Sequence, residues 1–225
     1  MTPSSPLPRR GFLARLAAGA AGAAALATGL PAVAGARPLG RRPADDPDHW
    51  LDALTGKHRQ IYDVLSPEKA SEGAAFARNF LNANNQGYGL TDSEVNAVVS
   101  FRHMAFAMGL DDAMWSKYAL GELLGWNDPN AKAPAVRNTI AGAAGDTRPQ
   151  SASLAALHSR GAVFTVCGMA MAAFAGRAAE RAGASHDAVV ADFRAHLVPG
   201  AIEVVAGVIA VNRAQERGLS YVYVG

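Results

Sequence analysis

Residues 161–173 read GAVFTVCGMAMAA, and this stretch decides the fold that the sequence predicts. Residues 162–166 are mostly β-branched or aromatic, which is typical of a short buried strand, and Gly168 then precedes an Ala- and Met-rich helical run. We therefore expect a strand-to-helix switch with Cys167 at the carboxyl end of the strand. In parallel α/β sheets ligands bind at that end, and the following helix directs its positive N-terminus at the thiol, which favours the reactive thiolate.

Cys167 is the only cysteine of the 225-residue chain, so it has no partner for an internal disulfide. Free cysteine is also among the most buried residue types, and a small buried hydrophobe is the alternative interpretation. In an oxidising compartment three states remain open for a single thiol: an intermolecular disulfide, a reactive thiol, or a buried inert one.

Strands and helices alternate along the rest of the chain. Further strands are predicted at residues 58–65, 95–101, 202–205 and 219–224, and helices at residues 66–83, 113–126, 151–160, 170–182 and 206–217. Asn84 to Gly87 are expected to end the first of these helices, and Gly218 the last, in a left-handed cap. This alternation predicts an α/β domain over residues 49–225, a three-layer α/β/α sandwich with a mainly parallel sheet of about five strands.

Residues 126–149 break the pattern. They contain Pro129, Pro134, Pro149 and several glycines, and no helical or strand periodicity. We expect a long surface excursion, and excursions of this length within a compact domain are often functional.

The N-terminal residues 1–36 resemble an export signal. Arg9-Arg10-Gly11-Phe12-Leu13 precede an uncharged Ala/Gly/Leu run, and small residues at Ala34 and Ala36 offer two cleavage points. Paired arginines before a weakly hydrophobic run are typical of the twin-arginine route, which predicts a periplasmic or otherwise extracytoplasmic protein with residues 37–48 as a linker. An uncleaved anchor is the alternative, because residues 16–36 approach membrane-spanning length.

The charge of the chain excludes one class of partner. The formal net charge is +2, but three of the 21 basic residues lie within residues 1–36. The remainder carries 18 basic and 19 acidic residues and no basic stripe, so we expect no nucleic-acid partner, and membrane contact only through the export signal.

The carboxyl-terminal third of the chain resembles a known family. VCGMAM at residues 166–171 and LVPGAIEVVAGVIAVNRAQERGLSYVYVG at residues 197–225 are similar to the DsrE/DsrF-like family, related to the sulfur-relay Tus proteins. The resemblance is strongest over residues 150–225 and looser over residues 49–125. It implies a three-layer α/β/α fold, a homo-oligomer, and a cysteine that carries a persulfide between a donor and an acceptor protein.

These observations define the expected site. Cys167 is the candidate persulfide-forming residue, and His103 and Arg102, at the end of the strand over residues 95–101, are weaker candidates for supporting the thiolate. A surface or core-edge histidine with a satisfied hydrogen bond is the alternative for His103. Six scattered histidines and a single cysteine predict no metal site, and the chain has no phosphate-binding or nucleophile-elbow motif, so we expect no cofactor.

Two functions from different classes follow. The first is an exported persulfide carrier that handles sulfane sulfur or thiols through Cys167. The second is a non-catalytic α/β module that binds a small ligand or oligomerises, with an inert buried cysteine. Whether the protein is an enzyme stays open at this level.

Overall fold

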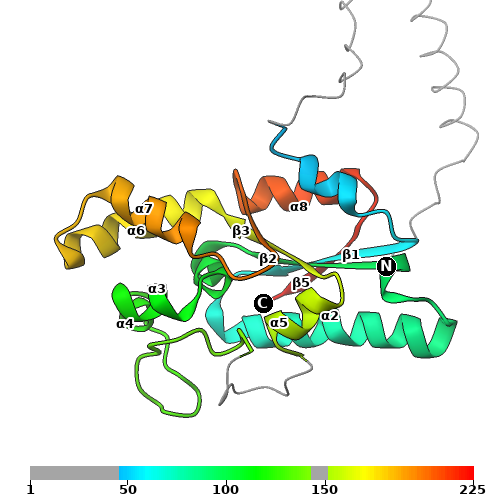
Figure 1. The fold of residues 1–225 in the computed structure, drawn as a ribbon, viewed down its shortest axis with the longest axis horizontal. Coiled ribbons are helices and arrows are strands. Elements are labelled where there is room, and N and C mark those ends of the chain that lie inside the picture. The colour runs from blue at the N-terminus through cyan, green and yellow to red at the C-terminus, as the bar shows by residue number, and fades with distance from the viewer. Residues whose placement is uncertain (1–45, 143–151) are drawn as a thin grey trace, which may run out of the picture. The chain divides into compact units, whose positions relative to one another are not determined.

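The predicted strands assemble into one parallel sheet. The computed structural model describes residues 46–142 and 152–225, and within them the strands are β1 (His58–Val64), β2 (Val95–Phe101), β3 (Val163–Cys167), β4 (Ala201–Val204) and β5 (Ser220–Val224). Their spatial order is β4-β3-β2-β1-β5, and all neighbouring pairs are parallel. Helices cover both faces, so the predicted three-layer α/β/α sandwich is confirmed (Figure 1).

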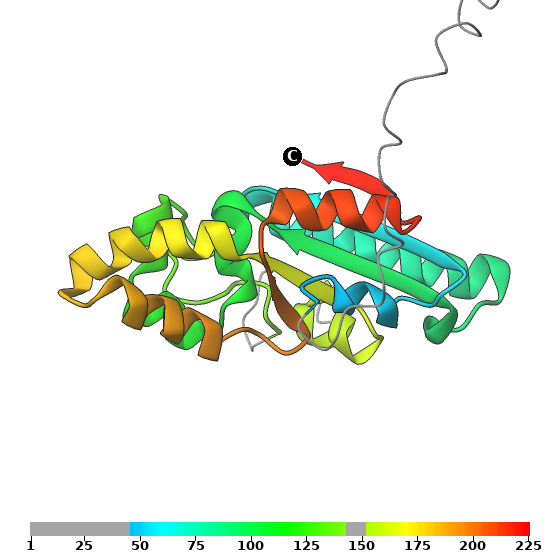
Figure 2. The same ribbon diagram turned by 90° about the horizontal axis from the view of Figure 1, so that it is seen from above.

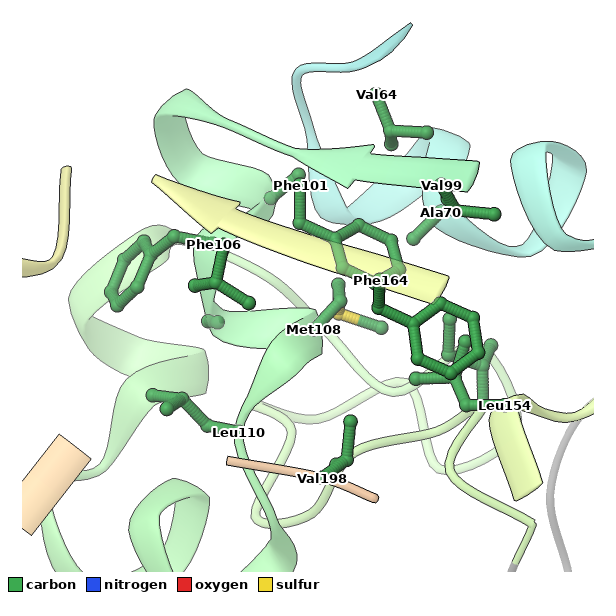
Figure 3. Close-up of a cluster of buried hydrophobic side chains, with 14 of the residues drawn as sticks. Val64, Ala70, Val99, Phe101, Phe106, Met108, Leu110, Leu154, Phe164 and Val198 are labelled. Atoms are coloured by element: carbon green, nitrogen blue, oxygen red, sulfur yellow. The ribbon is translucent and has the colours of Figure 1, made fainter. Parts of the chain in front are cut away.

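One face of the sheet packs against helix α2 (Pro67–Tyr88). Val64, Val99, Phe101 and Phe164 lie on this face and are fully buried in the larger hydrophobic core (Figure 3). Phe101 and Phe164 stack with their ring centroids 6.2 Å apart. This face is apolar because it is covered from end to end, as expected for a parallel sheet that is buried on both sides.

The opposite face packs against helix α8 (Gly207–Glu216) and the short 3-10 helix η2 (His49–Ala53) (Figure 1). A second, smaller core forms here, which includes Ile61 and Val98 from the sheet, Ala210 from α8 and Trp50 from η2. Because side chains alternate along a strand, β1, β2 and β3 each send every second residue to this face.

The chain beyond the carboxyl edge of the sheet is helical. Helix α6 (Gly168–Ala182) runs outward from that edge and packs against α7 (His186–Ala195), as Figure 2 shows. Three short helices, η4 (His103–Gly109), α3 (Asp112–Lys117) and α4 (Leu120–Leu124), lie beside them. The remaining described helices are η3 (Asp92–Glu94) and α5 (Leu154–Ser159).

Helix α2 is longer than predicted. Asn84 to Gly87 do not end it, because the Asn84 side chain donates to the carbonyl of Phe80 within the helix and so stays compatible with it. The helix ends instead at Gly89, whose φ of 68° is left-handed, and the amides of Gly89 and Leu90 donate to the last carbonyls. The glycine that can adopt a left-handed conformation terminates the helix, rather than the amide-rich run before it.

One helical prediction needs correction, and one helix was not predicted. The helix expected over residues 113–126 is broken into α3 and α4 at Ala119, which has a φ of 46°. Helix α7 was not predicted, although Ser185 caps it by accepting from the amide of Ala188. The α7 pattern is short, and its buried face is defined by packing on α6 and, through Phe193, on Phe106 and Tyr118, so periodicity alone does not identify it.

The segment over residues 126–142 is not a surface excursion throughout. Ala135, Thr139 and Ile140 are buried, and the buried Asn138 donates from its side-chain amide to the carbonyls of Met108 and Leu110. Residues 143–149 of the predicted excursion lie outside the described residues, as do the export signal and residues 37–45 of the linker.

Candidate functional site

Cys167 occupies the predicted position. It is the last residue of β3 and the N-cap of α6, and its Sγ accepts a hydrogen bond of 3.4 Å from the amide of Ala170. The sulfur therefore lies at the positive end of a 15-residue helix, where negative charge is stabilised. Cys167 is only 7% exposed.

The tight switch at Cys167 depends on the glycine that follows. A Cβ at Gly168 would lie 2.8 Å from Oε1 of Glu203 and 3.0 Å from the carbonyl oxygen of Val204. No side chain fits between the start of α6 and strand β4 there. The glycine thus allows the chain to turn directly from the strand into the helix beside its neighbour strand.

Arg102 lies one strand away from Cys167, immediately after β2. Its guanidinium makes a bidentate pair with the Asp63 carboxylate: Nε donates to Oδ1 at 2.5 Å, and Nη2 donates to Oδ2 at 2.8 Å. The hydroxyl of Tyr221 donates to the same Oδ2 at 2.8 Å. Asp63 is 1% exposed and the Arg102 side chain 23%, so a buried carboxylate holds a partly exposed cation in one orientation.

These contacts change the proton affinities of both donors. The hydrogen bond to Asp63, with the charge of that carboxylate, raises the pKa of Arg102 above its ordinary value. Burial raises the pKa of Tyr221, and its hydrogen bond to Asp63 raises it further. Arg102 therefore remains a cation, and Tyr221 a neutral donor, at any physiological pH.

The N-terminus of α8 completes the site. Gly207, the first residue of α8, packs so closely that a Cβ there would lie 2.5 Å from the Cβ of Arg102 and 3.3 Å from the Cβ of Cys167. Helix α8 therefore begins directly over these two residues. The N-termini of α6 and α8 converge on Cys167, and both favour negative charge.

Behind Arg102 and Cys167 lie two buried hydroxyls. Ser100 and Thr165 stand two residues earlier on β2 and β3, pair with each other in the sheet register, and face α8. Both are 0% exposed, and neither hydroxyl has a hydrogen-bond partner among the described residues. Asp63 is the register partner of Ser100 on the other side.

A second arginine–carboxylate pair lies on the other flank of Cys167. Arg194 makes a bidentate pair with Glu203: Nε donates to Oε2 at 2.7 Å, and Nη2 donates to Oε1 at 2.8 Å. An open hollow of about 520 Å³ lies here, and its lining includes this pair together with Met169 and Val205. The two flanks of Cys167 thus differ in chemistry: Arg102 and α8 on one side, and Glu203 with its partner on the other.

His103 lies at the strand end, as predicted, but in a different setting from Cys167. It is exposed, begins η4 with a left-handed φ of 52°, and makes no hydrogen bond or ion pair among the described residues. Gly207 packs against the Cβ atoms of both Arg102 and Cys167, while the Arg102 guanidinium is directed to Asp63 on β1. Among the described residues, no contact of this kind links His103 to Cys167.

Sequence reasoning missed Asp63, Tyr221 and Gly207. The available signal was Asp63 itself, because an acid in the otherwise apolar stretch IYDVL requires a buried partner. That the partner is Arg102 depends on the β1–β2 register, and the role of Tyr221 depends on β5 lying next to β1 rather than β4.

Metal binding and membrane insertion find no support in the described part of the chain. Over residues 46–142 and 152–225, no three His, Cys, Asp or Glu side chains gather in a way that could hold a metal ion. Within the same residues, each helix is too short or too polar to cross a bilayer.

Comparison with known proteins does not identify a relative of this chain. The chain gives no significant match to any family model, to any curated protein, or to any solved structure. The function of the protein is therefore inferred from its own residues.

Proposed function

We propose that the protein is a sulfur carrier that accepts sulfane sulfur on Cys167. The observation that carries this proposal is the position of the Cys167 sulfur, at the carboxyl edge of the sheet where the N-termini of α6 and α8 converge beside Arg102. Helix N-termini and nearby arginines are typical surroundings of reactive cysteines in proteins. The resemblance of residues 150–225 to the DsrE/DsrF-like family supports the same chemistry.

The transfer step needs no external oxidant or reductant. The Cys167 thiolate attacks the outer sulfur of a donor persulfide, R–S–SH, and forms a new S–S bond. The donor's S–S bond breaks, and its electron pair leaves with R–S⁻. The product, Cys167–S–SH, holds the sulfane sulfur until an acceptor thiolate removes it by the same step.

Burial of Cys167 favours a small donor. Cys167 is buried, with 7% of its surface exposed, so a donor has to be small to reach its sulfur, and the cysteine of another folded protein needs a larger opening. Export through the twin-arginine signal is part of the proposal: in an oxidising compartment, burial of the single cysteine protects it from intermolecular disulfides.

The low exposure also favours the second candidate, a ligand-binding or oligomerising module with an inert thiol. Val205, Val208 and Ile209, at the start of α8, are between 46% and 63% exposed, and an apolar patch of this kind is typical of a binding surface. This alternative requires no reaction at the Cys167 sulfur.

Intact mass spectrometry separates the two candidates. The purified full chain is incubated with polysulfide, with and without prior blocking of thiols by iodoacetamide. A carrier gains one sulfur, about 32 Da, on Cys167, and loses it on reduction. The Cys167→Ala variant is the matched control and gains nothing.

The inert-thiol reading makes the opposite prediction. Cys167 then gains no sulfur and reacts with iodoacetamide only after the protein is unfolded in urea. That result would eliminate the carrier function.

A further inference from the structure

We propose that the hollow beside Cys167 is the donor site of the carrier, and that it binds a small organic persulfide, R–S–SH, whose R group is apolar and uncharged. This inference rests on the proposed function, because it names the donor and its route to Cys167. Three observations support it: the place of the hollow in the sheet topology, its position next to Cys167, and the chemistry of its lining.

The hollow lies where the sheet topology places a ligand site. After β3 the chain enters α6, which packs into the larger core, and after β4 it enters α8, which packs into the smaller core on the opposite face. Figure 2 shows the two helices running in opposite directions from the carboxyl edge of the sheet. Adjacent parallel strands whose chains leave to opposite faces open a crevice between their carboxyl ends, and ligands bind in such crevices.

The residues at these two junctions line the hollow. They are Gly168 and Met169 at the start of α6, and Val204 and Val205 at and just after the end of β4. The hollow of about 520 Å³ therefore occupies the crevice between β3 and β4. Its volume is in the range of small-molecule sites in proteins.

Cys167 lies beside two residues of this lining. Gly168 follows it in the chain, and Val204 is its register partner on β4. Register partners on adjacent strands point to the same face of the sheet, so the side chains of Cys167 and Val204 are neighbours. The hollow therefore adjoins the residue that carries the thiol.

The mouth of the hollow is apolar. Met169 and Val205 both line it, and they are 67% and 63% exposed. Gly168 and Ala172 have no side chain or a small one, which leaves the space between α6 and β4 open. An apolar ligand in this space would remove Met169 and Val205 from water, and that burial is favourable.

The charged part of the lining disfavours a charged donor. Arg194 engages both oxygens of Glu203, so this carboxylate has little left to offer a cationic ligand. Asp46 is a second carboxylate in the lining, and the two acids outnumber the single arginine, which repels an anionic ligand. The ring of His49 also lies here, with Nδ1 2.9 Å from the carbonyl oxygen of Asp46. A neutral, apolar R group is the class that this lining accepts.

The sulfur transfer balances with this donor. The Cys167 thiolate attacks the outer sulfur of R–S–SH, a new S–S bond forms, and the S–S bond of the donor breaks. Its electron pair leaves with R–S⁻, and the proton stays on the transferred sulfur in Cys167–S–SH. The leaving group is an anion, so the carboxylates of the lining favour its release after the neutral donor has bound.

Two matched variants test the route. Ala172→Phe places an aromatic ring in the hollow, because Ala172 lines it. Ala173→Phe makes the same change one residue later in α6, at an exposed position outside the lining, so its helix-propensity cost is the same. Met169→Gln is a third variant that makes the mouth polar, and its exposed position keeps the core intact if Ala172→Phe does not fold.

The first measurement is binding without sulfur transfer. Diethyl sulfide, a thioether that cannot donate sulfur, is titrated into the full chain carrying Cys167→Ser at pH 8, where histidine is uncharged. We expect saturable NMR shifts of the Met169 and Val205 methyl groups, and none with the anion ethanesulfonate. The shifts should be lost in Ala172→Phe, weakened in Met169→Gln and retained in Ala173→Phe. No shift of either methyl group overturns the site, and equal shifts with ethanesulfonate overturn the ligand class.

The second measurement compares two donors by intact mass, each rate being divided by the rate with free cysteine. We expect wild type to load from ethyl hydropersulfide at least about tenfold faster than from 2-sulfoethyl hydropersulfide. Ala172→Phe should slow loading from the ethyl donor at least about tenfold, and Ala173→Phe should match wild type. Equal loading of all three proteins overturns the route and leaves the carrier function standing. Loading from neither donor refutes the carrier function, and the NMR titration then decides by itself whether the hollow binds neutral ligands.

Discussion

Replacing Arg102 with glutamine should destabilise the protein by leaving Asp63 buried without its cation. Asp63 is 1% exposed and accepts three hydrogen bonds, two from Arg102 and one from Tyr221. Breaking a buried pair by removing one partner costs about 3–5 kcal/mol. Because the Arg102 side chain is 23% exposed and partly solvated, we expect a loss of about 3 kcal/mol in the free energy of unfolding.

The double variant Asp63→Asn/Arg102→Gln isolates the cause. It removes both charges and keeps side chains that can hydrogen-bond, so most of the lost stability should return, to within about 1 kcal/mol of wild type. Arg194→Gln is the control, because it removes an arginine from a bidentate pair that lies at the surface rather than in the interior. The Arg194 side chain is 57% exposed, and this change should cost less than about 1 kcal/mol.

Urea unfolding followed by circular dichroism measures all three variants. With a slope of about 2 kcal/mol per molar urea, Arg102→Gln should lower the midpoint by about 1.5 M. If Arg102→Gln lowers the free energy of unfolding by less than about 1 kcal/mol, then the Asp63 carboxylate is not left buried without a cation in the folded protein. A double variant as unstable as the single one would show that the cost comes from lost packing rather than from buried charge.

Three further predictions follow from the structure. Gly207→Ala would place a Cβ 2.5 Å from the Cβ of Arg102, so it should cost about 1–3 kcal/mol and lower the Tm, whereas Gly176→Ala, with open space around it, should raise the Tm slightly. Thr165→Val removes a hydroxyl without a partner, and the free energy of unfolding should stay level or rise by up to about 1 kcal/mol; a clear loss in urea unfolding would reveal a hidden partner. Hydrogen bonds from a lysine ammonium and a backbone amide lower the pKa of Glu94 to about 2 from 4.5, so its contribution to stability is present above pH 4.5 and is lost as the pH falls toward 2. The Tm of Glu94→Gln should therefore fall less steeply than that of wild type across this range, and parallel curves would contradict the assignment.

The strands were predictable because their signal is local. Residues 95–101 form β2 with the predicted bounds, and β3 lies within one residue of its predicted range. A strand covered on both faces needs an uninterrupted apolar, β-branched run, and that composition is visible without knowing its neighbours. Gly183 and Gly218 likewise mark helix ends through their left-handed conformations.

The site was only half predictable, for a physical reason. The sequence places Cys167 and Arg102 at strand ends, because a strand and the turn after it are local features. Which strand ends lie together is decided by pairing between segments far apart in the chain. Asp63 reaches Arg102 across 39 positions and Tyr221 across 158, and both contacts exist only because β1 lies between β2 and β5.

Taken alone, the amino-acid sequence determined the α/β class, the strands, and the position of the cysteine at a strand-to-helix switch, since hydrophobic pattern and glycine placement act over a few residues. Only the tertiary structure decided the strand order, the buried carboxylate that orients Arg102, and the start of α8 over Cys167. These features depend on which surfaces exclude water from one another, and that is a property of the packed chain rather than of any single stretch of it.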